Sequence, residues 1–434
     1  MTEKKPHLLY VAWGYPPARG SGVYRAVATP NEFAARGWRV TVVTADRESF
    51  AKYTGADTSL ENLIDPRVRV IRVPFRRPYL EDDVGQWSRL RTYFGYPWLA
   101  LQTIREQLAF PEPRYGFWLP ALRRAVRAIH AAEPVDLVIG TANPFVDMAG
   151  AASLRKDGVP YILDHRDAWQ LNTFTGARVT RAGGRVDRIE RRLFREAAEV
   201  WFVNQPILRW HAELYPESAA TMREVPNGAD GELEPRLPRG DRPIRFTYVG
   251  TITSQVPVAQ LGQGWALADA RGELDDAEGH LYGYVGFFTR EDSPEQRALT
   301  QALEISRLEY LGPAPKAELP AIYRDSDVLL LAMGGAEYIT SGKTYEYLAT
   351  GLPIVSVHDP RSAASEVLAD YPLWFPAASL APADIADALA AAAREVRDPD
   401  PQRWRAAAAG AHAYQRTVIL APHIDRLREQ VSPA

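Results

Sequence analysis

The chain has 434 residues, no cysteine and a formal net charge of −3. This length predicts two or three domains, and a hydrophobic content of 46% is enough to fill their cores. The lack of cysteine excludes disulfides, thiolate nucleophiles and Cys-ligated zinc, and the small net charge argues against nucleic acid as a partner. Without a signal-peptide core or an apolar run of bilayer length, we expect a cytoplasmic protein with at most weak peripheral membrane contact.

The first half of the sequence alternates apolar runs with glycine-rich stops. We expect a helix over residues 23–37, in which Pro30 predicts a kink or a late start. The opening order of strand, glycine-rich loop, helix and strand is typical of a right-handed βαβ unit. The expected strands of this half cover residues 7–13, 38–45, 67–75, 135–141, 199–204 and 159–169, the last of which runs into a polar cluster.

A second series of the same kind follows the loop-rich residues 223–243. We predict domains over 1–228 and 229–415, and a C-terminal helix in 416–434 that crosses back to the first domain. The predicted fold class is α/β, with two Rossmann-like doubly wound lobes facing across a cleft that would hold a small molecule. The expected strands cover 244–251, 279–286, 307–312, 327–333 and 352–357, and the expected helices cover 341–351, 381–393 and 403–430.

The loop at residues 14–22 is the first candidate for a binding site. Gly20, Ser21 and Gly22 precede the first helix, where a close backbone approach and free N–H groups suit an anion. An ordinary strand-to-helix turn explains the glycines equally well. The spacing matches neither a dinucleotide-binding fingerprint nor a Walker motif, which disfavours dehydrogenases and P-loop enzymes.

Two charged segments are stronger candidates. Asp164, His165, Arg166 and Asp167 directly follow an apolar strand, where charges are costly unless they are paired or used. They indicate either a site or a salt-bridge network that satisfies itself. Lys343 lies in the first turn of a helix, where the dipole disfavours a cation, so a bound anion would explain it better than an ordinary surface position.

Two further segments have a simpler default interpretation. The sequence at residues 225–230 contains Pro-Asn-Gly, which by itself predicts a tight turn. Residues 87–130 interleave arginine with aromatic side chains, a pattern that suits an acceptor or a membrane surface but is more often an amphipathic helix packed on its own domain.

Taken in order, these segments resemble the retaining glycosyltransferases of family 4, which have the GT-B fold. The resemblance extends over nearly the whole chain. It is carried by YVAWGYPPARGSGVYRAVATPNEFAARGWRVTVVTA at the start, by ILDHRDAW, by VPNGAD, by EYLGPAPKAELPAIYRDSDVLLLAM and by SGKTYEYLATGLPIVSV. It implies transfer of a sugar from a nucleotide-diphosphate sugar to an acceptor hydroxyl with retention of anomeric configuration.

The resemblance also implies roles for single residues. The acceptor would be a small molecule or a glycan or lipid-linked acceptor, with no nucleic acid, metal or other cofactor required. Asn143 and Trp169 would lie on the acceptor side, and residues 311–313 would line the base pocket. The implied catalytic residues are His165, Arg166, Asp167 and Lys343, and the implied donor-binding residues are Gly20, Ser21, Gly22, Thr251, Gly312, Pro313, Thr340, Ser341, Gly342, Lys343, Thr344 and Glu346.

The chain departs from the family pattern at two points. The segment at residues 249–260 has no basic residue to grip a diphosphate, and Glu337 lies one position out of register with the first of the family's two glutamates. These departures leave three alternatives open: a GT-B protein that acts on a non-sugar cyclitol, a nucleotide-sugar epimerase, or a catalytically inactive partner that binds the donor.

Overall fold

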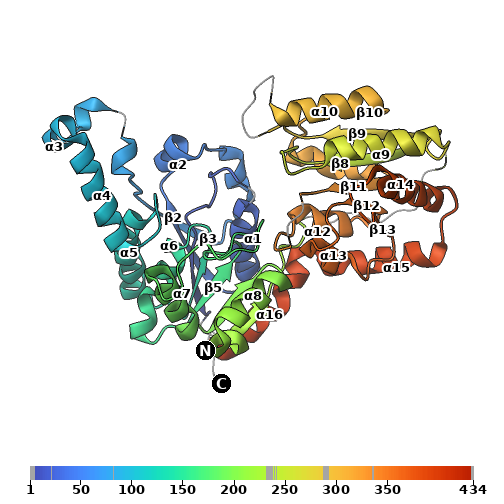
Figure 1. Ribbon diagram of the computed structural model, residues 1–434. Coiled ribbons are helices and arrows are strands. Elements are labelled where there is room, and N and C mark those ends of the chain that lie inside the picture. Colours follow the sequence, from blue (N-terminus) through green and yellow to red (C-terminus); the bar gives the residue numbers. More distant parts are fainter. Residues whose placement is uncertain are drawn as a thin grey trace. The chain divides into compact units, whose positions relative to one another are not determined.

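The computed structural model describes residues 5–20, 22–81, 83–230, 238, 240, 242–286, 293–334 and 337–431, which fold into two compact units (Figure 1). The first unit comprises residues up to 172, residues 177–226 and the chain from residue 420 onward. The second comprises residues 173–176 and 227–419. Ser21, one of the predicted donor-binding residues, lies outside the described residues.

The first unit is built on a parallel sheet in the order β3-β2-β1-β4-β5-β6-β7. Its central strands are almost continuous apolar runs, as expected for strands covered on both faces. The sheet reverses its winding between β1 and β4, where Leu9 pairs with Thr41 on one side and Val138 on the other. The strands are β1 (His7–Val11), β2 (Arg39–Ala45), β3 (Val68–Val73), β4 (Leu137–Thr141), β5 (Tyr161–His165), β6 (Glu199–Phe202) and β7 (Met222–Glu224).

The first helix begins at Gly22 and continues past Pro30, so the late start, one of the two alternatives for Pro30, is wrong. Helix α5 shows why such segments are helical, since its buried Leu119, Leu122, Val126 and Ile129 recur at three- and four-residue spacing. The helices of this unit are α1 (Gly22–Ala35), α2 (Arg47–Tyr53), α3 (Arg89–Tyr93), α4 (Gly95–Ala109), α5 (Leu119–Ala132), α6 (Val146–Ala151), α7 (Arg185–Glu196) and α8 (Gln205–Leu214).

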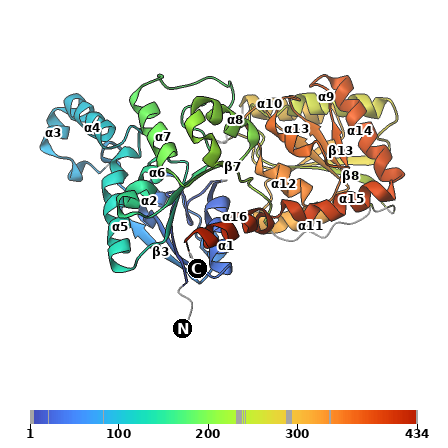
Figure 2. The ribbon, with the colours of Figure 1, turned by 90° about the horizontal axis from the view of Figure 1, so that it is seen from below.

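The last helix of the chain, α16 (Arg416–Val431), returns to the first unit and lies beside α1 (Figure 2). Asp425 forms an ion pair with Arg36 of α1 at 2.9 Å, and Arg426 pairs with Glu199 of β6 at 2.8 Å. His423 packs on Trp201 of the same strand. These contacts fix the C-terminal turns of α16 against the sheet.

The second unit repeats the design with a parallel sheet in the order β10-β9-β8-β11-β12-β13, whose winding reverses between β8 and β11. The predicted α/β class with two parallel sheets is confirmed. The strands are β8 (Ile244–Val249), β9 (Ala277–Tyr282), β10 (Leu308–Gly312), β11 (Val328–Ala332), β12 (Ile354–Val357) and β13 (Trp374–Pro376). The helices are α9 (Val258–Ala270), α10 (Pro294–Ile305), α11 (Leu319–Arg324), α12 (Gly342–Leu348), α13 (Ala363–Leu368), α14 (Pro382–Arg397) and α15 (Pro401–Ala411).

A single continuous core holds the second unit together, with Phe246, Trp265 and Leu330 fully buried among its members. Within the described part of the chain, no helix combines the length and apolar character needed to cross a membrane.

Candidate functional site

The loops that follow β1 and β4 meet at the winding reversal of the first sheet, the position where open α/β sheets bind ligands. A cavity of about 220 Å³ opens there. Four of the predicted site residues line it, although they come from three separate segments: Gly20, Gly22, Asn143 and Arg166. The chain therefore brings part of the predicted set together at one edge of one sheet.

Arg166 lies across the start of α1. Its guanidinium occupies the space that a Cβ at position 22 would need, so any side chain at Gly22 would displace it. Its Nη2 donates to the Asp167 carboxylate at 2.7 Å, and both side chains are partly exposed. The glycine and the arginine thus belong to one local arrangement, with the cationic group in the wall of the cavity.

Asp164 has a purely internal partner. Its carboxylate accepts hydrogen bonds from Arg25 of α1 at 2.7 and 2.9 Å, and both side chains are buried. The third nitrogen of Arg25, Nη1, donates to the carbonyl of Pro226 at 2.9 Å. For Asp164, the salt-bridge interpretation of the charged segment therefore describes the structure.

His165 does not face a sugar in this structure, contrary to its predicted role. Successive strand residues point to opposite faces of a sheet, so the imidazole turns away from Asp164 and lies fully buried against Phe194 and Phe202. Burial lowers the pKa of His165 well below its usual value. Arg166 and Asp167 stay at the surface because they follow the end of β5.

Trp169 is stacked between Phe110 and Phe145, with ring centroids 5.0 and 5.2 Å apart. The loop that carries Asn143 is held from below by a buried carboxylate, since Glu112 accepts hydrogen bonds from the backbone N–H groups of Phe145 and Val146 at 2.9 and 2.7 Å. Burial raises the pKa of Glu112 to about 7.

Asp147, fully buried next to this loop, accepts the backbone N–H of Trp13 at 2.7 Å and so ties the loop after β4 to the end of β1. Burial raises its pKa well above the ordinary value. Sequence reasoning missed Glu112 and Asp147. The available signal was an acidic residue inside an otherwise apolar or proline-rich segment.

In the second unit, Lys343 lies on α12 at the winding reversal of its sheet. Ser341 caps the helix by accepting the backbone N–H of Lys343 at 3.3 Å, and Gly342 is exposed. The Lys343 Nζ lies 4.9 Å from the centroid of the Tyr248 ring and fills the space that a Cβ at Gly250 would need. No ion pair joins it to the described residues. Burial lowers the pKa of Lys343 to about 8, although the Glu346 carboxylate opposes the shift.

One turn along α12, the Glu346 carboxylate accepts a hydrogen bond from the Tyr323 hydroxyl at 3.0 Å. Thr344, between Lys343 and Glu346, is fully buried and its hydroxyl has no protein partner among the described residues. It therefore lies beneath the helix, away from the surface on which its predicted donor-binding role depends. Thr340 is also buried, whereas Ser341 is partly exposed.

The carboxyl ends of β8, β9 and β10 all carry glycine. Gly250 has φ +157°, and a Cβ at Gly283 would overlap the Gly250 carbonyl oxygen. The Gly283 N–H donates to the Gly312 carbonyl at 2.9 Å. This side-chain-free backbone lies beside Lys343, and Thr251 and the exposed Leu311 and Pro313 border it. Gly250 and Gly283 were not among the predicted site residues, although a glycine after each apolar strand was the signal.

Comparison with known proteins identifies a domain in the first part of the chain. Residues 20–228 match the model of the glycosyl transferase 4-like domain. This stretch of the chain carries a glycosyl transferase 4-like domain, and the fold of the two units is that of GT-B proteins. A search of curated proteins found no match.

Solved structures resemble this GT-B chain over nearly its full length. A glycosyltransferase from Rickettsia africae is 10% identical, with a TM-score of 0.66 and full coverage of both chains. HepE from Anabaena, solved in complex with UDP and glucose, is 14% identical with a TM-score of 0.61, covering 98% of this chain and 100% of its own. Sucrose-phosphate synthase from Thermosynechococcus elongatus is 18% identical with a TM-score of 0.59, covering 98% and 99%. At these identities the likeness establishes the fold.

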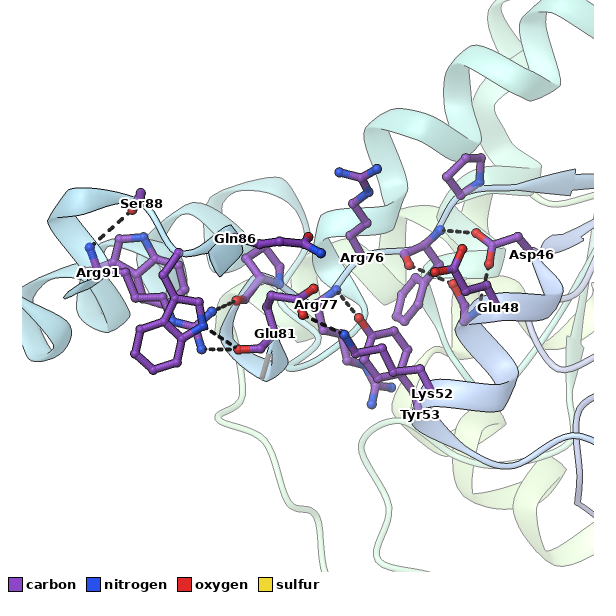
Figure 3. Close-up of a pocket in the computed structure, with 16 residues that line it drawn as sticks. Asp46, Glu48, Lys52, Tyr53, Arg76, Arg77, Glu81, Gln86, Ser88 and Arg91 are labelled. Atoms are coloured by element: carbon purple, nitrogen blue, oxygen red, sulfur yellow. Dashed lines mark hydrogen bonds and ion pairs between the residues drawn. The ribbon is translucent and has the colours of Figure 1, made fainter. Parts of the chain in front are cut away.

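A second, larger cavity of about 660 Å³ lies in the glycosyl transferase 4-like domain, between α2 and the segment leading into α3 (Figure 3). Lys52 and Glu81 form an ion pair at 2.9 Å in its wall. The Arg91 guanidinium lies over the Trp87 and Trp98 rings, 4.0 and 4.8 Å from their centroids. Arginine-rich aromatic walls of this kind suit a polar or anionic ligand with an apolar portion.

The Pro-Asn-Gly turn has a definite structural partner. Arg416 donates to Asp230 at 2.7 Å and also to the backbone carbonyls of Asn227 and Gly228. Gly228 has φ +67°, and a Cβ there would press on the Arg416 backbone. The motif therefore anchors the beginning of α16, in addition to forming a turn.

Proposed function

We propose that this chain transfers a glycosyl group from a nucleotide-diphosphate sugar to an acceptor hydroxyl, with retention of anomeric configuration. Donor recognition belongs to the second unit. The observation that carries the proposal is Lys343, a half-buried cation that lies against the bare backbone of Gly250 and forms no ion pair with the described residues, although the Glu346 carboxylate acts on it from farther away. Burying a cation without a partner is costly, and a diphosphate would supply the missing charge.

The neighbouring groups suit the rest of a donor. Glu346, fixed by Tyr323, is an acceptor for the hydroxyls of a ribose. The glycine ends of β8 and β9 leave room for a ligand to approach the backbone closely.

The proposed mechanism uses no protein nucleophile. The acceptor hydroxyl attacks from the face that the diphosphate leaves, the anomeric carbon–oxygen bond to the diphosphate breaks, and a phosphate oxygen takes the hydroxyl proton. Negative charge develops on the departing diphosphate, and a preorganised positive group there lowers the barrier. Lys343 would have this role.

The first experiment identifies the donor and then tests Lys343. A thermal-shift screen of UDP, GDP, ADP and dTDP sugars should find one class that raises the melting temperature, because binding to the folded state stabilises it. With that donor, Lys343→Ala should lower turnover by about a hundredfold or more, which corresponds to about 2.7–4 kcal/mol of barrier. The exposed Arg271→Ala should keep wild-type turnover.

Other outcomes would assign the chain to one of the alternative functions. Donor binding without turnover on any acceptor would indicate an inactive donor-binding protein, and interconversion of two nucleotide sugars would indicate an epimerase. Wild-type turnover by Lys343→Ala would contradict the role that the proposed mechanism gives to this lysine.

For the acceptor, we propose a lipid-linked molecule presented at a membrane surface. Helix α4 has an inverted arrangement, because its buried residues are the polar Gln102 and Glu106, and Glu106 accepts a hydrogen bond from Tyr79 at 3.2 Å. Both views show α3 and α4 standing away from the sheet of their unit (Figures 1 and 2). The large apolar side chains that these helices and the residue joining them expose are Leu90, Tyr93, Phe94, Tyr96, Leu99, Leu101, Ile104 and Leu108.

An exposed apolar surface of this extent is typical of an interaction site, and the exposed Arg89 and Arg105 add the charge that anionic lipid attracts. Sedimentation with phosphatidylglycerol vesicles should pull down the wild-type chain. Ile104→Glu combined with Leu108→Glu should reduce the bound fraction several-fold, whereas Ile305→Glu, at an exposed apolar position of the second unit, should not. Equal binding by all three proteins would exclude this surface.

A further inference from the structure

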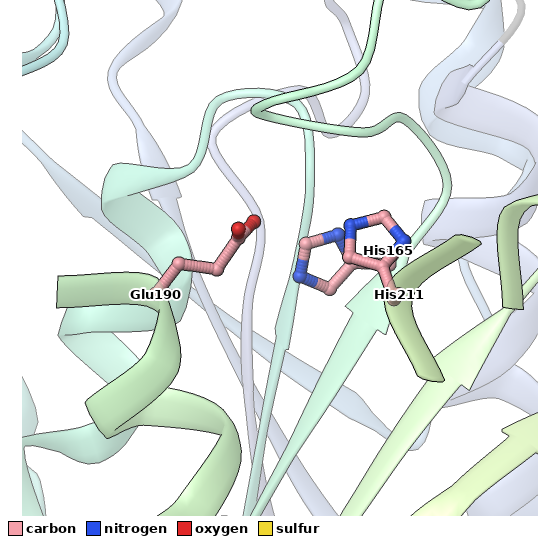
Figure 4. A group of neighbouring side chains, drawn as sticks. All are labelled: His165, Glu190 and His211. Atoms are coloured by element: carbon pink, nitrogen blue, oxygen red, sulfur yellow. The ribbon is translucent and has the colours of Figure 1, made fainter. Parts of the chain in front are cut away.

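Three buried side chains of the first unit point toward one another (Figure 4). They are His165 at the end of β5, Glu190 on α7 and His211 on α8. One ligand-type atom from each lies within 4.8 Å of those of the other two. The exposed fraction is 0% for both histidines and 1% for the glutamate, so water from the surface does not solvate them.

The hydrogen bonds around the cluster fix which ring nitrogen of each histidine carries the proton. The His165 Nδ1 lies 3.2 Å from the Asp167 carbonyl, and the His211 Nδ1 lies 2.8 Å from the Ile207 carbonyl. A carbonyl oxygen only accepts, so each Nδ1 carries the proton. In the neutral rings each Nε2 is therefore an acceptor. Neither Nε2 has a protein partner among the described residues.

The carboxylate completes the same pattern. Glu190 Oε2 accepts hydrogen bonds from the Gln170 amide at 2.5 Å and the Tyr215 hydroxyl at 3.0 Å, whereas Oε1 has no partner in the described chain. Burial raises the pKa of Glu190 to about 7, and when this carboxyl group is ionised the cluster brings two accepting imidazole nitrogens and a carboxylate together with no donor among them. Such a set repels itself unless a cation lies at its centre.

We propose that His165, Glu190 and His211 bind a zinc ion inside the first unit. Two histidines and one carboxylate form an established zinc ligand set, with water in the fourth position. The outer hydrogen bonds agree with this assignment, because metal-bound histidines generally donate their other ring N–H to a carbonyl or carboxylate. The ion would join β5, α7 and α8 and so hold the turn that carries Arg166 and Asp167. Because all three ligands are buried, we assign the ion a role in holding these elements together, independent of the proposed sugar transfer.

The test is the metal content of the full-length chain, expressed in zinc-supplemented medium and purified without a histidine tag. Elemental analysis should find about one zinc per chain. Removal by a chelator should lower the melting temperature by about 5 °C or more, and added ZnCl₂ should restore it. Zinc well below one-tenth per chain, with no response of the melting temperature to ZnCl₂, would overturn the proposal. A proton shared within the cluster would then be the required cation.

Variants locate the ion. Glu190→Gln and His211→Gln should each lose the zinc. His358→Gln is the matched control and should retain it, because His358 is also buried with its Nδ1 on a carbonyl and its Nε2 without a described partner, yet belongs to no such group. Full zinc content in both cluster variants would contradict the site.

If these variants do not fold, X-ray absorption of the wild-type chain tests whether the bound zinc has imidazole ligands. It should show nitrogen and oxygen ligands at about 2.0–2.2 Å with imidazole scattering. A first shell without imidazole would place the metal elsewhere.

Discussion

The two sheets have the same direction and the same reversal of winding, but the ionisable groups at their carboxyl ends differ in how they are paired. In the first unit, the buried Asp164 is paired with Arg25, and the partly exposed Asp167 with Arg166. In the second unit, Lys343 is half-buried, has no described carboxylate partner and is packed on glycine backbone. Paired charges maintain a fold, whereas a desolvated cation without a partner favours an anionic ligand. Similar sheets can therefore position charge either for stability or for binding.

The largest expected change in stability comes from breaking the buried ion pair of the first unit. Asp164→Ala should destabilise the chain by about 3–5 kcal/mol, because it leaves the buried Arg25 without its carboxylate. Urea unfolding measures the loss. The double variant Arg25→Met with Asp164→Leu should lose less than Asp164→Ala, since no buried charge is then left unpaired. Arg166→Ala, at a partly exposed pair, should change stability by about 1 kcal/mol or less.

The second prediction concerns Lys343, whose replacement should raise the stability of the chain instead of lowering it. Its folded pKa, about 8, lies below the ordinary value of 10.5, so the unfolded chain binds more protons between these pH values. Stability from this group therefore rises as the pH increases from about 8 to 10.5, and the full penalty applies at pH 7. Lys343→Met should be more stable than wild type by about 1–2 kcal/mol at pH 7, after allowance for its partial exposure, and this difference should shrink by pH 10.

Unfolding curves at the two pH values give this difference directly. A less stable Lys343→Met chain at pH 7 would mean that the lysine stabilises the fold and needs no ligand. Affinity for the donor found in the screen should also weaken as the pH rises above about 8, because Lys343 then loses its positive charge.

The smallest expected effect concerns the hydrogen bond that orients Glu346. Tyr323→Phe removes one donor to this carboxylate, which corresponds to about 0.5–1.5 kcal/mol, or about two- to tenfold weaker donor binding. Calorimetry with the identified donor measures it. Tyr371→Phe removes a buried hydroxyl that donates to the Leu352 carbonyl and should leave donor affinity unchanged. Equal donor affinities for wild type and Tyr323→Phe would contradict the proposed role of Glu346 in donor recognition.

Much of the fold could be predicted because apolar runs and glycine stops are local signals. The run at residues 7–13 predicted β1, and the loop after it ends where α1 begins. The strands β7 and β13 were not predicted, since three residues are too few to show a period. Pro30 suggested a kink or a late start, whereas α1 begins at Gly22 and includes the proline.

The candidate site was harder to predict, because its chemistry depends on partners that lie far apart in the chain. Placing Arg166 and Asn143 near Gly22 needed only the rule that parallel strands end at the same edge. The sequence contained no sign that His165 turns inward while Arg166 stays at the surface, nor that Thr344 lies beneath α12.

By itself, the sequence determined two wound α/β units and the loops that follow their strands, because strand and turn preferences act within a few residues. Only the tertiary structure decided which charges are paired. Arg25 with Asp164, Lys343 against Gly250, and the group of His165, Glu190 and His211 join segments that are distant in sequence. The energy of a charge depends on its burial and on the distance to its partner, and both are set by how the elements pack.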